Sequence, residues 1–193
     1  MIIYGSGGHS KVVMSACTDE VKAFFDDHSN QPTFRGKPVF PYTADTQPKE
    51  LVVIAIGDNK VRQMIANTVR HSFGTVVDKS VIIDSSCIVG KGSQVLHGAI
   101  IQADAEVGEH TIVNTGASID HDSKVGDFCH IAPQVTLCGS VTVGDGTIIG
   151  AGSTIIPGIT IGKWCKIGAG SVVTKNVPDN GIAVGNPARV IKT

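Results

Sequence analysis

Every sixth residue from Val77 to Val173 is valine, isoleucine or leucine, and this register never breaks. Such a period fits neither the turn of an α-helix nor the two-residue alternation of a long strand. It fits a short strand followed by a turn, repeated and stacked as a solenoid. Three repeats make one triangular coil, and successive coils stack at the strand spacing of about 4.8 Å. The repeat therefore predicts a β-solenoid whose aliphatic side chains point inward.

Two further columns accompany the aliphatic one. Four positions after each aliphatic residue the side chain is mostly small, and Cys87, Cys129 and Cys165 stand in this column as expected core thiols. Directly after the aliphatic residue the chain often has glycine, aspartate or asparagine, such as Gly108 and Asp120, which tolerate turn geometry. We therefore expect small residues to fill the corners of the coils. The odd total of five cysteines without a C-x-x-C pair does not indicate a disulfide or zinc framework.

The first seventy-six residues follow a different pattern. Three apolar runs, 1–4, 21–27 and 51–57, are predicted strands, and helices are predicted after the glycine turn at 5–10 and over 58–72. The second helix has its apolar residues spaced as Val61, Ile65 and Val69. Strand, glycine turn, helix and strand make half of a Rossmann-type unit. The sequence thus predicts two domains, residues 1–76 and 77–193.

The glycine turn has part of a dinucleotide-binding fingerprint. Gly5 and Gly7 fit it, but Ser10 stands where the third glycine is expected. Asp26 and Asp27 follow about 20 residues on, where an acid commonly contacts a ribose hydroxyl. Because there is room for only one mononucleotide half, a nucleotide is a better ligand than NAD. The alternative is a small packing domain whose glycines serve only its turns.

Composition excludes several partners. The net charge is −1 and 17% of the residues are charged, so no nucleic-acid or anionic-membrane surface is expected. No apolar run has the length of a membrane helix or a signal peptide. We expect a soluble, cytoplasmic protein without membrane insertion.

Five segments carry a resemblance that spans the chain: GSGGH (5–9), FFDD (24–27), AIGDN (55–59), VNTGASIDHDSKVGDFCHIAP (113–133) and VPDNGIAVGNPARVI (177–191). In these segments the chain resembles the sugar O-/N-acyltransferases of the sialic acid O-acetyltransferase type. Within that group it looks like the N-acetyltransferases of UDP- or GDP-linked 4-amino-4,6-dideoxyhexoses. The resemblance implies a small Rossmann-like α/β N-terminal domain followed by an all-β left-handed parallel β-helix. The left hand rests on the resemblance alone, because ordinary parallel crossovers are right-handed.

The resemblance also implies roles for particular residues. His121 matches the general base, Asp122 the acid that increases its basicity, and His130 a histidine near the acetyl group of acetyl-CoA. Close relatives can carry glutamate in place of Asp122. Backbone at Ala151 and Ala169 is expected to meet the CoA arm, with acetyl-CoA between neighbouring prisms of a homotrimer. The residues expected to contact the nucleotide sugar are Gly7, Gly8, His9, Asp26, Asp27 and Gly57.

The chemistry of acetyl transfer agrees with these roles. An attacking amine must lose a proton, and a base with a pKa near 7 takes it best. A carboxylate on the other imidazole nitrogen fixes the tautomer and stabilises the imidazolium. Asp120 and Asp122 both flank His121, so either can do this. The register places His121 two residues beyond Ile119, on a corner of the prism and outside its core.

Three other functions remain as alternatives. A γ-type carbonic anhydrase needs three converging imidazoles with a short H-x4-H spacing, which His97, His110, His121 and His130 do not provide, so no metal is expected. A non-catalytic scaffold is the second. The third is an O-acetyltransferase acting on sialic acid, because no residue in the sequence distinguishes an amine acceptor from a hydroxyl acceptor. His97 is expected at the surface or an interface, and His110 in solvent.

Overall fold

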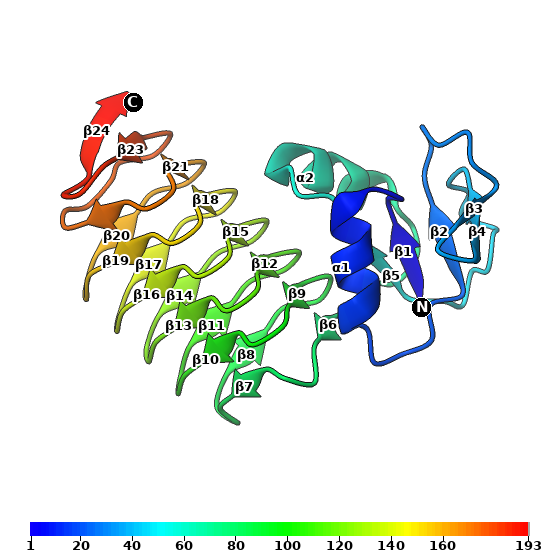
Figure 1. The fold of residues 1–193 in the computed structure, drawn as a ribbon, viewed down its shortest axis with the longest axis horizontal. Coiled ribbons are helices and arrows are strands. Elements are labelled where there is room, and N and C mark those ends of the chain that lie inside the picture. The colour runs from blue at the N-terminus through cyan, green and yellow to red at the C-terminus, as the bar shows by residue number, and fades with distance from the viewer. Residues whose placement is uncertain (193) are drawn as a thin grey trace.

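The N-terminal part of the chain is a small sheet flanked by two helices. The structure, a computed structural model that describes residues 1–192, places five strands in the order β3-β4-β2-β1-β5 (Figure 1). The elements are β1 (Ile2–Tyr4), α1 (Gly8–Ala16), β2 (Ala23–Phe25), β3 (Thr33–Phe34), β4 (Lys37–Phe40), β5 (Val52–Ile54) and α2 (Asn59–Thr68). Strands β4, β2, β1 and β5 are parallel, and β3 pairs with β4 as an antiparallel hairpin. The three expected strands and two expected helices are confirmed, whereas the hairpin, which turns at Arg35 and Gly36, was not predicted.

The rest of the chain winds into triangular coils with three parallel sheets. The first face consists of β6 (Val76–Val77), β9 (Gln94–Val95), β12 (Ile112–Val113), β15 (His130–Ile131), β18 (Ile148–Ile149), β21 (Lys166–Ile167) and β23 (Ile182–Val184), extended by antiparallel β24 (Arg189–Lys192). The second face consists of β7 (Ile82–Ile83), β10 (Ile100–Ile101), β13 (Ser118–Ile119), β16 (Thr136–Leu137), β19 (Thr154–Ile155) and β22 (Val172–Val173). The third face consists of β8 (Ile88–Val89), β11 (Glu106–Val107), β14 (Lys124–Val125), β17 (Thr142–Val143) and β20 (Thr160–Ile161). Each strand pairs with the strand one coil away, as Ile119 does with Leu137.

The aliphatic column fills the interior as predicted. From Val95 to Val173 every member of the column is buried. Ile83 is 40% exposed because it belongs to the first coil, which has no coil beneath it. Within residues 1–192 no helix has the length and apolar character needed to cross a membrane.

From Ser93 onward the small column is buried at the corners and links adjacent coils, whereas Cys87, expected in the core, is only partly buried in the first coil. Thr111 shows how: its Oγ1 donates to the carbonyl of Gly126 at 2.8 Å and accepts from the N–H of Cys129 at 2.9 Å. The buried hydroxyl is thus satisfied by the next coil.

Glycine after the aliphatic residue has a different purpose from the expected one. A Cβ on Gly108 would lie 2.4 Å from Asp127 Oδ1 in the next coil, so close approach of the coils demands glycine there. In most corners the left-handed residue comes two positions later, as at His110. Gly108 therefore stands at the start of a corner turn, but glycine is required there for the close approach of the coils and not for a left-handed φ.

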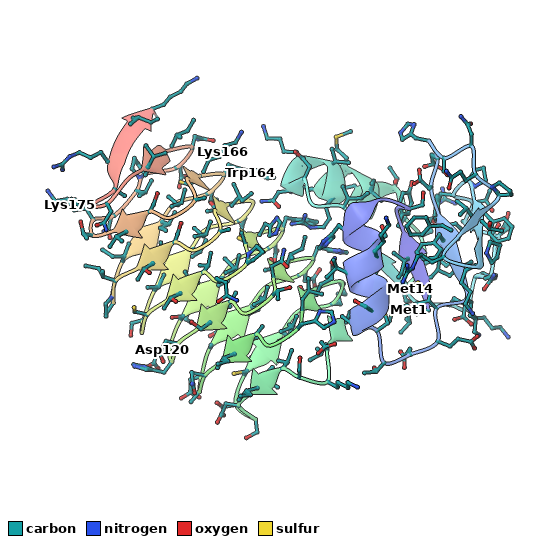
Figure 2. The ribbon with its side chains drawn as sticks, in the orientation of Figure 1. Met1, Met14, Asp120, Trp164, Lys166 and Lys175 are labelled. Carbon is teal, nitrogen blue, oxygen red and sulfur yellow. The ribbon has the colours of Figure 1, made fainter. Side chains whose placement is uncertain are left out.

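The N-terminal sheet packs on the first face of the β-helix. Leu96 and Ile112 on that face are buried in one cluster with Met1, Ile3 and Val13. Figure 1 shows α1 beside β6 and β9, with α2 above the following coils. The corner between the second and third faces, hereafter the far corner, lies on the opposite side of the prism. Figure 2 shows Asp120 at this edge, pointing away from the sheet.

Candidate functional site

His121 lies on the far corner, in the turn between β13 and β14. Its Nδ1 is 2.7 Å from Asp122 Oδ2, while Asp120 Oδ1 accepts from the backbone N–H of His121 at 2.8 Å. Asp122, and not Asp120, is therefore the partner of the imidazole. The hydrogen bond with Asp122, helped by the charge of Asp120, raises the pKa of His121 above its ordinary value.

Local geometry holds this pair in place. Asp122 has φ 60°, a left-handed conformation that aspartate tolerates better than most residues, and its N–H donates to Ala103 O at 3.1 Å. On the other side, the imidazole lies over buried Gly139 of the next coil, where a Cβ would be 2.7 Å from both Cε1 and Nε2. The side chain of His121 remains 57% exposed. The corner thus presents an oriented imidazole to the outside of the prism.

A second group of predicted residues gathers at the carboxyl ends of the N-terminal strands. Gly7, Gly8 and His9 follow β1, Asp26 and Asp27 follow β2, and Gly57 follows β5. Strand β1 lies between β2 and β5, so the chain leaves the sheet in opposite directions at this point. Ligands of open α/β sheets bind in the crevice at such a position.

The glycines at this edge are not needed for the fold. Gly7, Gly8 and Gly57 have no left-handed φ, and a Cβ on any of them would have no heavy atom within 4 Å. Gly5 differs, since it has φ +108° and a Cβ there would lie 2.9 Å from Ile56 Cδ1. Glycine without a conformational or packing reason keeps the backbone open to a ligand.

Both carboxylates at this edge are engaged within the chain. Asp26 Oδ2 accepts from the N–H and hydroxyl of Ser6 at 2.9 and 2.5 Å, and Oδ1 accepts from His28 N–H at 3.0 Å. Burial acts to raise the pKa of Asp26, but these hydrogen bonds outweigh it and lower the pKa. Asp27 accepts from the Tyr4 hydroxyl and from the Tyr42 N–H. Asp26 therefore fixes the glycine turn, and contact of either acid with a ribose stays a prediction.

His130 lies next to this edge, on the first face. His9 Nε2 contacts Gln94 Oε1 at 2.9 Å, and the rings of His9 and His130 are 6.4 Å apart. The Asn114 Oδ1 accepts from Thr115 N–H, so its Nδ2 donates to His130 Nε2 at 3.1 Å. In neutral His130 the proton therefore sits on Nδ1.

The surroundings keep these two imidazoles uncharged. Burial, the Arg62 cation and His9 lower the pKa of His130 to about 4, against an opposing backbone interaction with Gly57. Burial also lowers the pKa of His9, with the Gln94 contact opposing and Arg62 assisting. His130 is thus uncharged at neutral pH and is a weak proton acceptor.

A cavity of about 540 Å³ continues along the first face from His130. It lies between the turn at Gly57 and the later coils, and Ile148, Trp164 and Lys166 line it. Figure 2 shows Trp164 and Lys166 on the side of the β-helix that faces α2. Ala151 and Ala169 are exposed one coil apart on the corner between the first and second faces, where Ala151 O accepts from Gly170 N–H. Of the predicted CoA contacts, the two alanines therefore border the face that carries His130.

One chain does not bring all predicted residues together. His9, Gly57 and His130 meet where the sheet packs on the first face, whereas His121 and Asp122 lie on the far corner. In a triangular prism that corner is the edge opposite the first face.

Sequence reasoning missed Arg62 and misplaced His110. The predicted apolar stripe of α2 began at Val61, but Val61 is 42% exposed, and its neighbour Arg62 is completely buried. His110, expected in solvent, is only 3% exposed and stacks on Phe128 at 5.0 Å. His97, expected at the surface, is half-exposed and lies 3.4 Å from Asp78.

Within residues 1–192 no cluster of three or more His, Cys, Asp or Glu side chains is arranged to hold a metal ion.

The comparisons with known proteins cover both parts of the chain. Residues 1–69 match the PglD N-terminal domain, and residues 122–156 and 140–175 match the bacterial transferase hexapeptide repeat. A comparison with curated proteins gave no match.

Several solved structures are similar over the whole chain. Perosamine N-acetyltransferase from Caulobacter crescentus, solved with CoA and GDP-perosamine as a variant with one histidine replaced by asparagine, is 36% identical with a TM-score of 0.92. The alignment covers 100% of this chain and 96% of that one. The acetyltransferase domain of PglB from Neisseria gonorrhoeae, solved with acetyl coenzyme A, is 29% identical with a TM-score of 0.91, covering 98% of both chains. WeeI from Acinetobacter baumannii is 29% identical with a TM-score of 0.87, also covering 98% of both.

These likenesses confirm the expected fold, a small Rossmann-like α/β domain followed by a left-handed parallel β-helix. They extend over the segments that carried the resemblance in the sequence. The chain belongs to the hexapeptide-repeat sugar acetyltransferases with a PglD-type N-terminal domain.

Proposed function

We propose that the chain transfers the acetyl group of acetyl-CoA to the amino group of a UDP- or GDP-linked 4-amino-4,6-dideoxyhexose. A relative 36% identical over the whole chain is a perosamine N-acetyltransferase solved with CoA and GDP-perosamine, which supports this substrate class. The observation that carries the proposal is the exposed His121 imidazole held by Asp122 at 2.7 Å. It is a base without a structural task in the core.

In the proposed reaction His121 acts on the attacking amine. The amine nitrogen bonds to the thioester carbonyl carbon while Nε2 of His121 accepts the proton that this nitrogen loses. The Asp122 carboxylate accepts the hydrogen bond of Nδ1–H and stabilises the imidazolium that forms. When the carbon–sulfur bond breaks, the proton passes from Nε2 to the CoA sulfur, and His121 returns to its neutral form.

The remaining predicted residues bind and orient the two substrates. The nucleotide sugar is proposed to lie against Gly7, Gly8, His9 and Gly57, where open backbone N–H groups begin α1 and α2, with Asp26 and Asp27 at the nucleoside. Acetyl-CoA is proposed to lie along Ala151 and Ala169, with its thioester near neutral His130. Neutral His130 is a weak proton acceptor, so the role of general base is left to His121.

A homotrimer is proposed as the working form, in the cytoplasm. The separation of His121 from His130 on one prism supports it, because a second copy must place its far corner against the first face. Light scattering with size-exclusion chromatography at micromolar concentration is expected to give three times the chain mass. A monomer that retains full activity would contradict this arrangement.

The function is tested by following CoA release with a panel of acceptors. UDP- and GDP-linked 4-amino-4,6-dideoxyhexoses are expected to react, and mass spectrometry of the product should show one acetyl group on nitrogen. CMP-sialic acid and free sialic acid serve as hydroxyl acceptors in parallel. Acetylation of sialic acid without reaction of any amino sugar would replace the proposal by the O-acetyltransferase alternative.

A further inference from the structure

Arg62 is a buried cation without an acidic partner. It lies on α2, is 0% exposed, and forms no ion pair with any carboxylate in residues 1–192. The nearest acid in sequence, Asp58, caps α2 by accepting from Val61 N–H at 2.9 Å. Burial lowers the pKa of Arg62 to about 10, so the guanidinium stays charged at neutral pH. Burying such a charge costs free energy that an apolar side chain at this position would not cost.

The hydrogen bonds of Arg62 go almost entirely to backbone carbonyls. In the N-terminal part the guanidinium donates to the carbonyls of Ile56 at 2.8 Å and Gly57 at 3.3 Å, and to Asn59 Oδ1 at 2.8 Å. In the β-helix it donates to the carbonyls of His110 at 2.8 Å, Phe128 at 2.9 Å and Cys129 at 3.0 Å. The planar fork of arginine can make such a set of bonds, and the single ammonium of lysine cannot.

These partners are close to the proposed site. Gly57 begins the turn that faces the nucleotide-sugar edge, and Cys129 directly precedes His130 on the first face. Asn59, bound to Arg62, also donates to Gly146 O at 3.0 Å, in the coil beside the cavity. One side chain thus connects the turn at Gly57 to the strand that carries His130.

Arg62 also contributes to the electrostatics at the two neighbouring imidazoles, where burial has the larger effect. The groups that act on His130 are Arg62, His9 and the Gly57 backbone, and those that act on His9 are Gln94 and Arg62. In both cases the Arg62 cation adds to burial and lowers the pKa.

We propose that Arg62 is a positioning residue for acetyl transfer, which holds the Gly57 turn in a fixed position relative to the strand that carries His130. The proposal rests on the proposed function for its kinetic part only. A packing residue would explain burial but not a fully bonded cation whose partners flank Gly57 and His130.

The test compares Arg62→Lys and Arg62→Met with Arg70→Met, an exposed arginine just beyond α2, as the matched control. We expect Arg62→Lys to fold, to lower kcat roughly 10- to 100-fold, and to raise the KM of both substrates less than that, because small misplacements of a site are costly. In the full-length protein, NMR titration of the His130 imidazole should show a higher pKa in Arg62→Met than in the wild type, and an unchanged pKa in Arg62→Lys. Arg70→Met should change neither quantity.

Two outcomes would overturn the proposal. One is wild-type kcat and KM in Arg62→Lys together with a lower melting temperature, which would mean that Arg62 only stabilises the fold. The other is a His130 titration that does not move in Arg62→Met; if that variant fails to fold, Arg62→Gln replaces it. The titration needs no substrate, so it decides on Arg62 even if the wild-type chain acetylates none of the acceptors.

Discussion

His121 and His130 lie half a coil apart in the chain and have opposite surroundings. His121 is mostly exposed on the far corner, and hydrogen bonding to Asp122 raises its pKa. His130 is partly buried on the first face, and burial together with Arg62 lowers its pKa to about 4. The same side chain is therefore a proton acceptor at one position and a neutral hydrogen-bonding group at the other.

The difference follows from what each surface of the prism has to support. A corner residue such as His121 contributes nothing to the aliphatic core, and the two adjacent carboxylates raise its pKa. The first face is covered by a second domain, so any imidazole there loses its water and meets the Arg62 cation. A β-helix can thus provide two kinds of histidine half a coil apart.

Replacing His121 is expected to have the largest effect. His121→Ala should lower kcat roughly 10²- to 10⁴-fold, the usual contribution of a positioned general base, and leave acetyl-CoA binding intact. Raising the pH should partly rescue an amine acceptor, because unprotonated amine then forms without the base. His97→Ala, which replaces a half-exposed histidine near Asp78, is the matched control and should keep its activity. Full activity in His121→Ala would show that another group is the general base.

A methyl group under the imidazole tests its position without removing it. The Cβ of Gly139→Ala would lie 2.7 Å from Cε1 and Nε2 of His121, so the ring must shift. Displacement of a catalytic group by about 1 Å can cost roughly 10²-fold, and we expect a loss in kcat near that size. In a double-mutant cycle, Gly139→Ala should cost little more once His121 is alanine. Additive losses would show that Gly139 acts on something other than the imidazole.

Asp122 is expected to matter less than the imidazole it orients. Asp122→Asn keeps the shape but removes the charge, and we expect a loss in kcat of roughly tenfold, at the low end of acid–base contributions. Because neutral His121 is the active form, the acid limb of the kcat/KM profile should follow its pKa and move to lower pH in the variant. Asp120→Asn is the control, since Asp120 bonds only to the backbone of His121, and its shift should be smaller. An equal or larger shift in Asp120→Asn would reverse the assignment.

Much of the far corner could be predicted from the sequence, because the repeat fixes it. The aliphatic column sets which residues point inward, so the position of His121 follows from counting along the chain from Ile119. The choice between Asp120 and Asp122 did not follow, because it depends on which carboxylate takes the left-handed position of the turn.

The first-face site was harder to predict because its contacts come from two domains. The hydrophobic spacing of α2 favoured Val61 as an inward residue, but the helix buries Arg62 against carbonyls that only the docked β-helix supplies. No local pattern marks a cation whose partners are backbone atoms more than forty residues away. For the same reason His110, next to Glu109 in the sequence, resembled a solvent-exposed residue.

His110 gives the smallest expected effect and extends the comparison to a buried histidine outside the proposed site. It is 3% exposed between Phe73 and Phe128, and its Nδ1 has no hydrogen-bond partner in residues 1–192. Burial, Arg62 and Lys91 lower its pKa to about 4, with Asp127 opposing. The unfolded chain, with a pKa near 6.5, therefore binds a proton before the folded chain does. Stability from this residue is complete above the unfolded pKa and is lost as the pH falls toward the folded one.

Going from about pH 7.5 to about pH 5.5, His110 should account for a loss of about 1 kcal/mol in the free energy of unfolding. His110→Asn removes the titration and tolerates the left-handed φ of 52°. Urea unfolding of the variant should show a lower stability at every pH but a shallower decrease over this range, with unchanged kcat at neutral pH. His28→Asn, an exposed histidine, should keep the wild-type slope. The same slope in His110→Asn and wild type would mean that water reaches this ring, and that covering the first face does not by itself keep a histidine neutral.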